Sequence, residues 1–314
     1  MLNDIVKMGN PLLVFEEVKL IVSEMFPQFD FDSLDDFFKD TVRLFEGNYP
    51  GFQTCDTEYH DLKHTTDTLL AIARLIHGAT LRGLHFSKRG VFLALTSAML
   101  HDSGYILALD ESGQGAKYTL THVERSIDFL KRYFFENDYS DKDANLCDAI
   151  LKCTGLDEKI LQIEFLSWEN EILGKMLGTA DLLGQMGDRN YLEKLPFLYR
   201  EFSQGKIEGI GTELDFLDST PGFYKTTLER LAHDLGGVNV YMRYHFRARW
   251  DIDEDLYISS IENSIRYLEY VLKNYREDVH AHLKRGGMMR KFRKRYPELT
   301  KNRTQSKRSQ TQVM

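Results

Sequence analysis

Imidazole and carboxylate side chains occur at ordered positions along the chain and could together bind a divalent metal ion. His60 and His64 are four residues apart, His101 and Asp102 are adjacent, and Asp181 follows much later. Imidazole nitrogens and carboxylate oxygens are ligands that borderline-to-hard divalent metals accept. The residues fall in three separate stretches with helical patterning, as a metal site inside a helix bundle requires. The pattern therefore predicts a metal centre shared by three helices.

Helix geometry supports this interpretation. Residues four apart project from the same helix face, so His60 and His64 are expected to point the same way. His101 and Asp102 differ by about 100° around a helix axis, so both reach one ion only at the end of their helix. Asp181 lies in an apolar helix, where a buried carboxylate is costly unless it is paired or bound to a cation. One shared cation is the simplest explanation of the ionisable positions on the three apolar helices.

The elements that must position these residues are helices. Apolar residues recur at helical spacing over residues 13–25, 34–45, 91–100, 121–135, 144–153, 171–183, 223–232 and 255–274. Segment 91–100 is almost wholly apolar and is expected at the centre of the fold. Asp56 or Thr57 is expected to cap the helix that carries the histidines, whereas Pro196 and the stretch 205–211 are expected to interrupt the chain. The sequence shows no strand alternation and no internal repeat, so the predicted class is all-α.

Length and composition are typical of an ordinary globular protein. The chain has 314 residues, of which 42% are hydrophobic and 28% charged, and this length can bury a core without disulfides or structural metals. Its cysteines are few and are not paired at short metal-binding spacings, which favours a reducing compartment. No signal-peptide pattern and no run of about 18 apolar residues is present. We therefore expect a cytoplasmic protein.

The net charge of −8 hides a basic segment near the C-terminus. Residues 284–308 contain eleven Lys or Arg residues and one acid, which gives +10 and leaves −18 for the remainder. Such a tail could contact nucleic acid or an anionic surface. The alternative is a solvated and frayed terminus, because disorder concentrates at chain ends.

The order of the candidate ligands resembles that of the HD-domain superfamily of metal-dependent phosphohydrolases, over roughly residues 55–190. The segment Tyr-His-Asp-Leu-Lys-His-Thr-Thr-Asp at 59–67 is also similar to the opening motif of cyclic-nucleotide phosphodiesterases. The resemblance implies a helical bundle of HD-domain type and places His60 at the position of the general acid, which protonates the leaving oxygen. The metal ligands that it implies are His64, His101, Asp102 and Asp181.

We expect the chain to divide into four parts, of which the resemblance covers one. Residues 55–190 would form the metal-binding catalytic core. Helices in residues 1–54 would pack on it, residues 191–283 would form a C-terminal helical extension, and residues 284–314 would be a partly disordered basic tail.

The chemistry of phosphoester hydrolysis agrees with the implied roles. The reaction needs an activated water and charge neutralisation, which a divalent ion supplies, and a proton for the leaving group, which a histidine can supply. We predict a metal-dependent phosphohydrolase acting on a nucleotide or related phosphoester, with a phosphodiester favoured and with His60 and Asp102 as catalytic residues. The alternative is a non-catalytic module that binds metal and nucleotide as a sensor, in which nothing requires an acid beside the metal.

Further residues are candidates for contact with the substrate or for support of the site. His122 begins a predicted helix at a point where some HD-domain families place a histidine that holds a second metal or a phosphate. Lys63 and Arg125 could meet phosphate oxygens, although either could instead be a solvated surface charge. Asp67 lies one turn beyond His64 and could orient an imidazole, or could be a carboxylate on the helix surface.

Two departures from the superfamily leave the metal count and the substrate open. Cys153 stands where many two-metal members carry a further histidine, so one or two divalent ions are expected, and the sequence does not distinguish Mn, Mg, Zn, Fe, Ni or Co. His101-Asp102 is followed by Ser103-Gly104 and not by the Glu-Asp pair of guanosine-tetraphosphate hydrolases. The Ser-x-Gln signature that accompanies the base clamp of cyclic-nucleotide phosphodiesterases is not evident in the C-terminal third.

Overall fold

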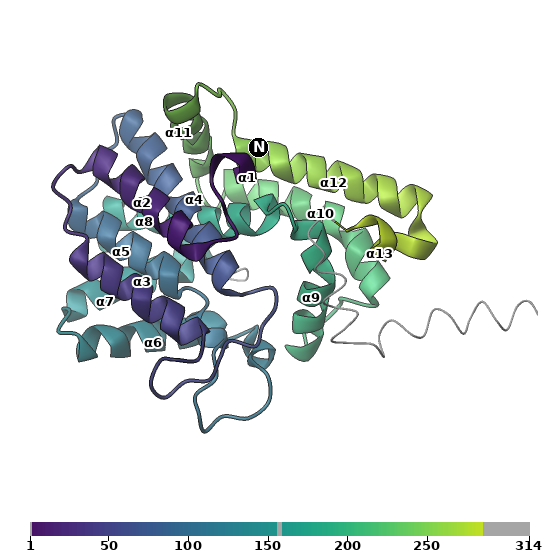
Figure 1. Ribbon diagram of the computed structural model, residues 1–314, viewed down its shortest axis with the longest axis horizontal. Coiled ribbons are helices and arrows are strands. Elements are labelled where there is room, and N and C mark those ends of the chain that lie inside the picture. The colour runs from purple at the N-terminus through teal and green to yellow at the C-terminus, as the bar shows by residue number, and fades with distance from the viewer. Residues whose placement is uncertain (1, 156–158, 285–314) are drawn as a thin grey trace, which may run out of the picture.

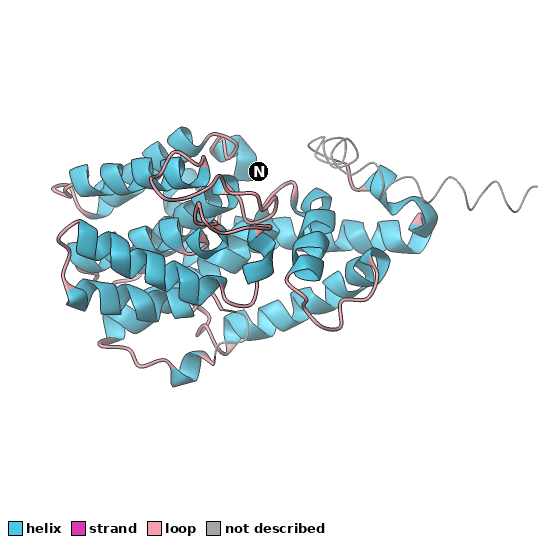
Figure 2. Ribbon diagram, turned by 90° about the horizontal axis from the view of Figure 1, so that it is seen from below, coloured by secondary structure: helices cyan, strands magenta, loops and turns pink. Residues whose placement is uncertain are grey.

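The computed structural model describes residues 2–155 and 159–284, and this part of the chain is built of helices (Figure 1, Figure 2). Within these ranges there is no strand, and the isolated extended pairing is a bridge between Phe52 and Ala108. The prediction of an all-α fold is confirmed. The α-helices are α1 (Leu2–Ile5), α2 (Pro11–Met25), α3 (Asp32–Phe45), α4 (Leu62–Leu81), α5 (Lys88–Leu100), α6 (His122–Glu136), α7 (Asp141–Lys152), α8 (Trp168–Gly187), α9 (Tyr191–Gln204), α10 (Glu213–Ala232), α11 (Tyr241–Trp250), α12 (Leu256–Asn274) and α13 (Val279–His282).

Helices α4 and α8 pack against each other at the centre of the bundle. Helices α2, α5 and α11 also pack against α4, while α5, α7 and α12 pack against α8. Every side chain from His64 to Ala79 of α4 is buried, and α5 is buried from Val91 to Leu100, as predicted for that segment. Polar side chains on such helices cannot reach bulk water, so they need partners inside the protein.

The C-terminal helices cover part of the central helices. Helix α11 packs against α4 and α12 packs against α8, and Figure 1 shows α9, α10, α12 and α13 grouped at one side of the bundle. The expected boundaries at residues 54 and 190 stay a prediction. All but the first residue of the expected basic tail, 284–314, lies outside the described residues. Among the helices that are described, none has the length and hydropathy needed to cross a membrane.

Proline placement differs from the expectation. The prediction that Pro196 interrupts the chain was wrong, because Pro196 lies within α9. Proline lacks the N–H that would bond to the carbonyl four residues earlier, so α9 loses one such hydrogen bond at Pro196 and continues past it. Residues 205–211 do separate α9 from α10, and Gly209 and Gly211 have positive φ values of 80° and 57°, which glycine adopts readily.

Asp255, the N-cap residue of α12, gives the fold a testable pH dependence. Its carboxylate accepts hydrogen bonds from the backbone N–H groups of Tyr257 and Ile258, yet burial raises the pKa of Asp255 from 3.8 to about 6. A carboxyl whose pKa is raised in the folded chain holds its proton more tightly there than in the unfolded chain. Its ionisation therefore costs stability as pH rises from 3.8 through about 6.

We expect Asp255→Asn to raise the melting temperature at about pH 8 and to leave it unchanged at about pH 4, where the wild-type carboxyl is largely protonated in the folded chain. Asparagine caps helices as well as aspartate does and carries no charge. Thermal unfolding followed by circular dichroism at both pH values measures the effect. A melting temperature below that of the wild type at about pH 8 would contradict the pKa shift.

Candidate metal centre

Three helices bring the expected ligands together. His64 lies in the first turn of α4, where the N-cap residue Asp61 accepts a hydrogen bond from the backbone N–H of His64 at 2.9 Å. His101 and Asp102 directly follow the last residue of α5. Asp181 comes from α8. All four candidate ligands are buried, so the side chains converge where water has little access.

The ligand atoms form a compact cluster. Nε2 of His64 lies 3.3 Å from Oδ2 of Asp102 and 3.1 Å from Oδ1 of Asp181. Nε2 of His101 lies 3.2 Å and 3.6 Å from the same two oxygens, and 3.2 Å from Nε2 of His64. The buried group of His64, His101 and Asp102 could hold a metal ion, and Asp181 adds an oxygen from a third helix.

Hydrogen bonding inside the cluster fits a cation. Nδ1 of His101 lies 2.8 Å from the backbone oxygen of Ala98, and a carbonyl only accepts, so the ring donates from Nδ1 and leaves the Nε2 lone pair facing the cluster. Oδ2 of Asp102 is buried and has no hydrogen-bond partner among the described residues. Lone pairs that face one another without donors repel, whereas a shared divalent ion would satisfy all of them. The residues present therefore fit a divalent metal.

The pKa values of the cluster also indicate that its carboxylates attract positive charge. Burial lowers the pKa of His64, but the adjacent carboxylates of Asp102 and Asp181 outweigh burial and raise that pKa to about 9. Burial raises the pKa of Asp181, but the adjacent imidazoles of His101 and His64 outweigh it and leave the pKa below its ordinary value. Without a metal, the carboxylates therefore favour protons on the imidazoles.

His60 lies before α4 and not on it. The expectation that one helix carries both His60 and His64 was wrong, because Asp61 caps the helix and Leu62 is its first residue. Ahead of the cap, the Thr57 hydroxyl donates to the backbone oxygen of His60 at 2.7 Å and closes a turn. The rings of His60 and His64 nevertheless approach closely, with centroids 5.8 Å apart.

Glu201 of α9 holds His60 in place, a role that sequence analysis did not identify. Its Oε2 lies 2.6 Å from Nδ1 of His60, and its Oε1 accepts hydrogen bonds from the backbone N–H groups of Glu58 and Tyr59, both at 2.7 Å. Glu201 is only 4% exposed. A carboxylate on Nδ1 fixes the ring orientation and leaves Nε2 as the nitrogen available to the cavity that His60 lines.

Tyr105 stacks between two histidines of the site. Its ring centroid lies 4.6 Å from that of His60 and 4.5 Å from that of His122. Nδ1 of His122 lies 2.8 Å from the backbone oxygen of Thr119, so the ring donates there, and its Nε2 lies 3.8 Å from Oδ1 of Asp102. Burial lowers the pKa of His122, which favours the neutral imidazole that can bind a metal.

The start of α6 approaches the His101-Asp102 segment because residue 104 is glycine. A Cβ atom on Gly104 would lie 2.0 Å from the backbone oxygen of His122. Ser126 of α6 joins the two segments, since its hydroxyl donates to the backbone oxygen of His101 at 2.7 Å and accepts from the N–H of Gly104 at 2.9 Å. This contact keeps His122 beside Asp102.

The structure places Lys63 and Arg125 in ion pairs with neighbouring acids. Lys63 Nζ lies 2.5 Å from Asp67 Oδ2 and 3.1 Å from Asp188 Oδ2, and Asp67 is buried, not on the helix surface. Arg125 pairs with Glu111 at 3.0 Å. Both cations are therefore paired with acids, and neither is among the residues that line the cavity next to the cluster.

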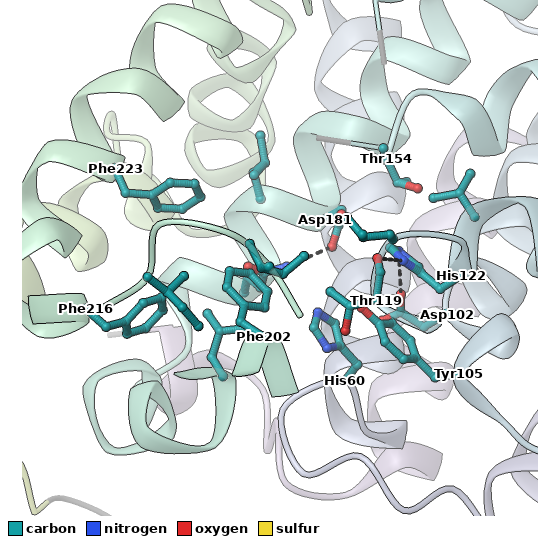
Figure 3. A pocket seen from close by; sticks show the side chains of 18 of the residues that line it. His60, Asp102, Tyr105, Thr119, His122, Thr154, Asp181, Phe202, Phe216 and Phe223 are labelled. Atoms are coloured by element: carbon teal, nitrogen blue, oxygen red, sulfur yellow. Dashed lines mark hydrogen bonds and ion pairs between the residues drawn. The ribbon is translucent and has the colours of Figure 1, made fainter. Parts of the chain in front are cut away.

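A cavity of about 630 Å³ opens from the cluster towards α9 and α10. Figure 3 shows His60, Asp102, Asp181 and His122 at one end and Phe202, Phe216 and Phe223 at the other. Its volume is in the range of small-molecule sites. A ligand in this cavity would meet the candidate metal centre at one end.

Comparisons with protein-family models, with curated proteins and with solved structures find no match. The assignment of a function therefore depends on the residues and geometry of the site.

Proposed function

We propose that this chain is a metal-dependent phosphohydrolase of the HD-domain type. The observation that carries the proposal is the convergence of His64, His101, Asp102 and Asp181 from three buried helices onto one point at the end of a cavity. The pairing of His60 with Glu201 beside this cluster favours catalysis over metal binding alone, because a sensor needs no oriented proton donor there.

Each side chain of the site has a separate role in the proposed hydrolysis. A divalent ion at the cluster would supply Lewis acidity and lower the pKa of water. His60 lines the same cavity and in its protonated form donates a proton to the leaving oxygen from Nε2. Glu201 holds the ring through Nδ1 and balances the positive charge of the imidazolium. Asp102 contributes one oxygen to the cluster and turns the other towards His122.

His122 decides whether one ion or two are bound. Its Nε2 lies near the Asp102 oxygen that is not turned towards His64, so His122 and this oxygen are the groups that would hold a second ion. Cys153, which occupies the position of a further histidine in many two-metal members of the superfamily, has its Sγ 3.6 Å from the backbone oxygen of Ala149. Its neighbour Thr154 lines the cavity. The described residues therefore offer four ligand side chains for one ion. For a second ion they offer His122 and the other oxygen of Asp102.

The direct test is turnover of a phosphoester panel by the full chain with manganese, magnesium or zinc. The panel contains phosphodiesters, including cyclic nucleotides, together with nucleotide monoesters and triphosphates. We expect metal-dependent release of product that is abolished by a chelator and restored by added metal. Stoichiometric metal binding with no turnover of any phosphoester would contradict the proposal and favour the sensor.

Glu201→Gln tests the orientation of His60. Glutamine is close in size to glutamate but cannot balance the charge of an imidazolium, and its amide nitrogen would not accept a hydrogen bond from Nδ1. We expect kcat to fall on the order of 10-fold to 10²-fold, part of the usual contribution of a general acid, with metal content unchanged. The matched control is Glu269→Gln, which changes an exposed acid of α12 that does not line the cavity. Equal kcat values for Glu201→Gln and the wild type would show that Glu201 does not support the acid.

A further inference from the structure

The far end of the cavity is apolar and comes from the C-terminal helices. Helices α9 and α10 and the segment between them supply a wall of aliphatic and aromatic side chains, opposite the candidate metal centre (Figure 3). The wall includes Leu195, Leu198, Phe202, Ile207, Phe216 and Phe223. Phe202 and Phe216 meet edge to face with ring centroids 5.9 Å apart. Such a wall gains free energy by removing apolar ligand surface from water.

The charges around the cavity disfavour a ligand with several phosphates. Among the described residues that line it, the acids are Asp102, Asp181, Glu124 and Glu208, whereas Lys159 is the one Lys or Arg. Lys159 is exposed. A polyphosphate requires several cations or backbone N–H groups for its oxygens, and apart from the metal end the described lining residues offer only the exposed Lys159 as a permanent cation. The other polar lining groups are neutral hydroxyls and amides, such as Thr154, Thr220 and Gln185.

We propose that the substrate is a phosphoester with one phosphate and a large, uncharged, apolar organic group. The phosphate would lie at the metal centre, and the organic group would extend along the wall formed by α9 and α10. This inference rests on the proposed phosphohydrolase function and narrows its substrate class. It favours alkyl or aryl phosphoesters over nucleoside triphosphates.

The test is a homologous series of p-nitrophenyl alkyl phosphates that differ only in a methyl, butyl or octyl chain. Because the leaving group is constant, kcat/KM reports contact of the chain with the protein. We expect kcat/KM to rise about fourfold for each added methylene until the wall is covered, and ATP to be the poorest substrate. Equal kcat/KM along the series, or a preference for ATP, would overturn the proposal.

A double variant, Phe202→Ser with Phe223→Ser, tests the wall itself. We expect the ratio of kcat/KM for the octyl ester to that for the methyl ester to lose most of its wild-type value. Phe135→Ser is the matched control, because Phe135 is 82% exposed on α6 and does not line the cavity. Folding of the double variant is verified by circular dichroism. If its kcat/KM depends on alkyl length as in the wild type, the alkyl group does not bind at this wall, and the proposal is contradicted.

A binding measurement separates this proposal from the proposed function. Calorimetric titration of the metal-loaded full chain with octylphosphonate and methylphosphonate requires no turnover. Tighter binding of octylphosphonate than of methylphosphonate, without hydrolysis of any ester, would support an apolar ligand pocket and contradict the proposed phosphohydrolase activity. Hydrolysis of the esters with equal binding of the two phosphonates would support the enzyme and overturn the apolar class.

Discussion

Asp102→Ala is expected to abolish metal-dependent hydrolysis, with a fall in kcat/KM on the order of 10³-fold or more. Asp102 faces three histidines of the site, because one oxygen faces both His64 and His101 and the other faces His122. Its removal leaves the imidazoles of His64 and His101 with one of the two carboxylates that make the site attractive to a cation. The measurement is turnover of the best phosphoester at saturating metal.

Asp110→Ala is the control for this variant, since Asp110 is an exposed aspartate between α5 and α6. Both proteins should show helical circular dichroism like that of the wild type. Asp102→Ala with wild-type activity would refute the assignment of the site. Equal losses in both variants would mean that activity depends on something other than the cluster.

His60→Asn is expected to lower kcat by about 10²- to 10⁴-fold on esters with poor leaving groups, because a positioned acid contributes about this much. Esters with a p-nitrophenolate leaving group need little protonation, so their kcat should fall far less. Metal content should stay at the wild-type value, since Nδ1 of His60 is bound to Glu201 and the cluster does not require His60. The measurement is kcat for a pair of esters that differ only in leaving group.

The leaving-group comparison separates proton donation from a structural role. A variant that merely distorts the site would lose activity equally on both esters. His85→Asn is a suitable control, because His85 is an exposed histidine between α4 and α5. Equal losses on both esters in His60→Asn, or lost metal, would contradict the role of His60 as general acid.

Local sequence signals were sufficient for α5 and α8, which position three of the candidate ligands, but they did not predict α9 or α11. Segment 91–100 has no polar face, so its burial followed from composition alone, and the chain after it had to place His101 and Asp102 inside the protein. Asp181 was recognised because a carboxylate within an apolar helix needs a partner. The structure brings these side chains together with His64, as the order of the motifs led us to expect.

Contacts between distant segments were not accessible from the sequence. Glu201 is 141 residues from His60, and its surroundings in the sequence resemble any amphipathic helix. The helix start was misplaced because Asp56, Thr57 and Asp61 are all good caps. In the structure the Asp56 carboxylate accepts from the distant Gly115 N–H and Glu201 accepts from the N–H groups of Glu58 and Tyr59, contacts that the local sequence does not reveal. Lys63 and Arg125 looked suited to phosphate, but their ion pairs with Asp188 and Glu111 depend on packing.

The apolar wall of the cavity also could not be predicted from the sequence. Phe202, Phe216 and Phe223 have the spacing of core residues on their own helices, α9 and α10. Only the arrangement of those two helices at one side of the cavity places their side chains opposite the candidate metal centre (Figure 3). A substrate class could therefore be proposed from the structure, whereas the sequence indicated only a type of reaction.

Metal content is the measurement that tests the central claim most directly. Elemental analysis of the purified full chain, and of apoprotein reloaded with manganese, magnesium or zinc, counts the ions for each mole of protein. The proposed site predicts one tightly bound divalent ion, or two if His122 completes a second position, and predicts loss of the ion in Asp102→Ala but not in Asp110→Ala. A folded wild-type protein that binds no divalent metal, or that binds it equally in Asp102→Ala, would contradict the account.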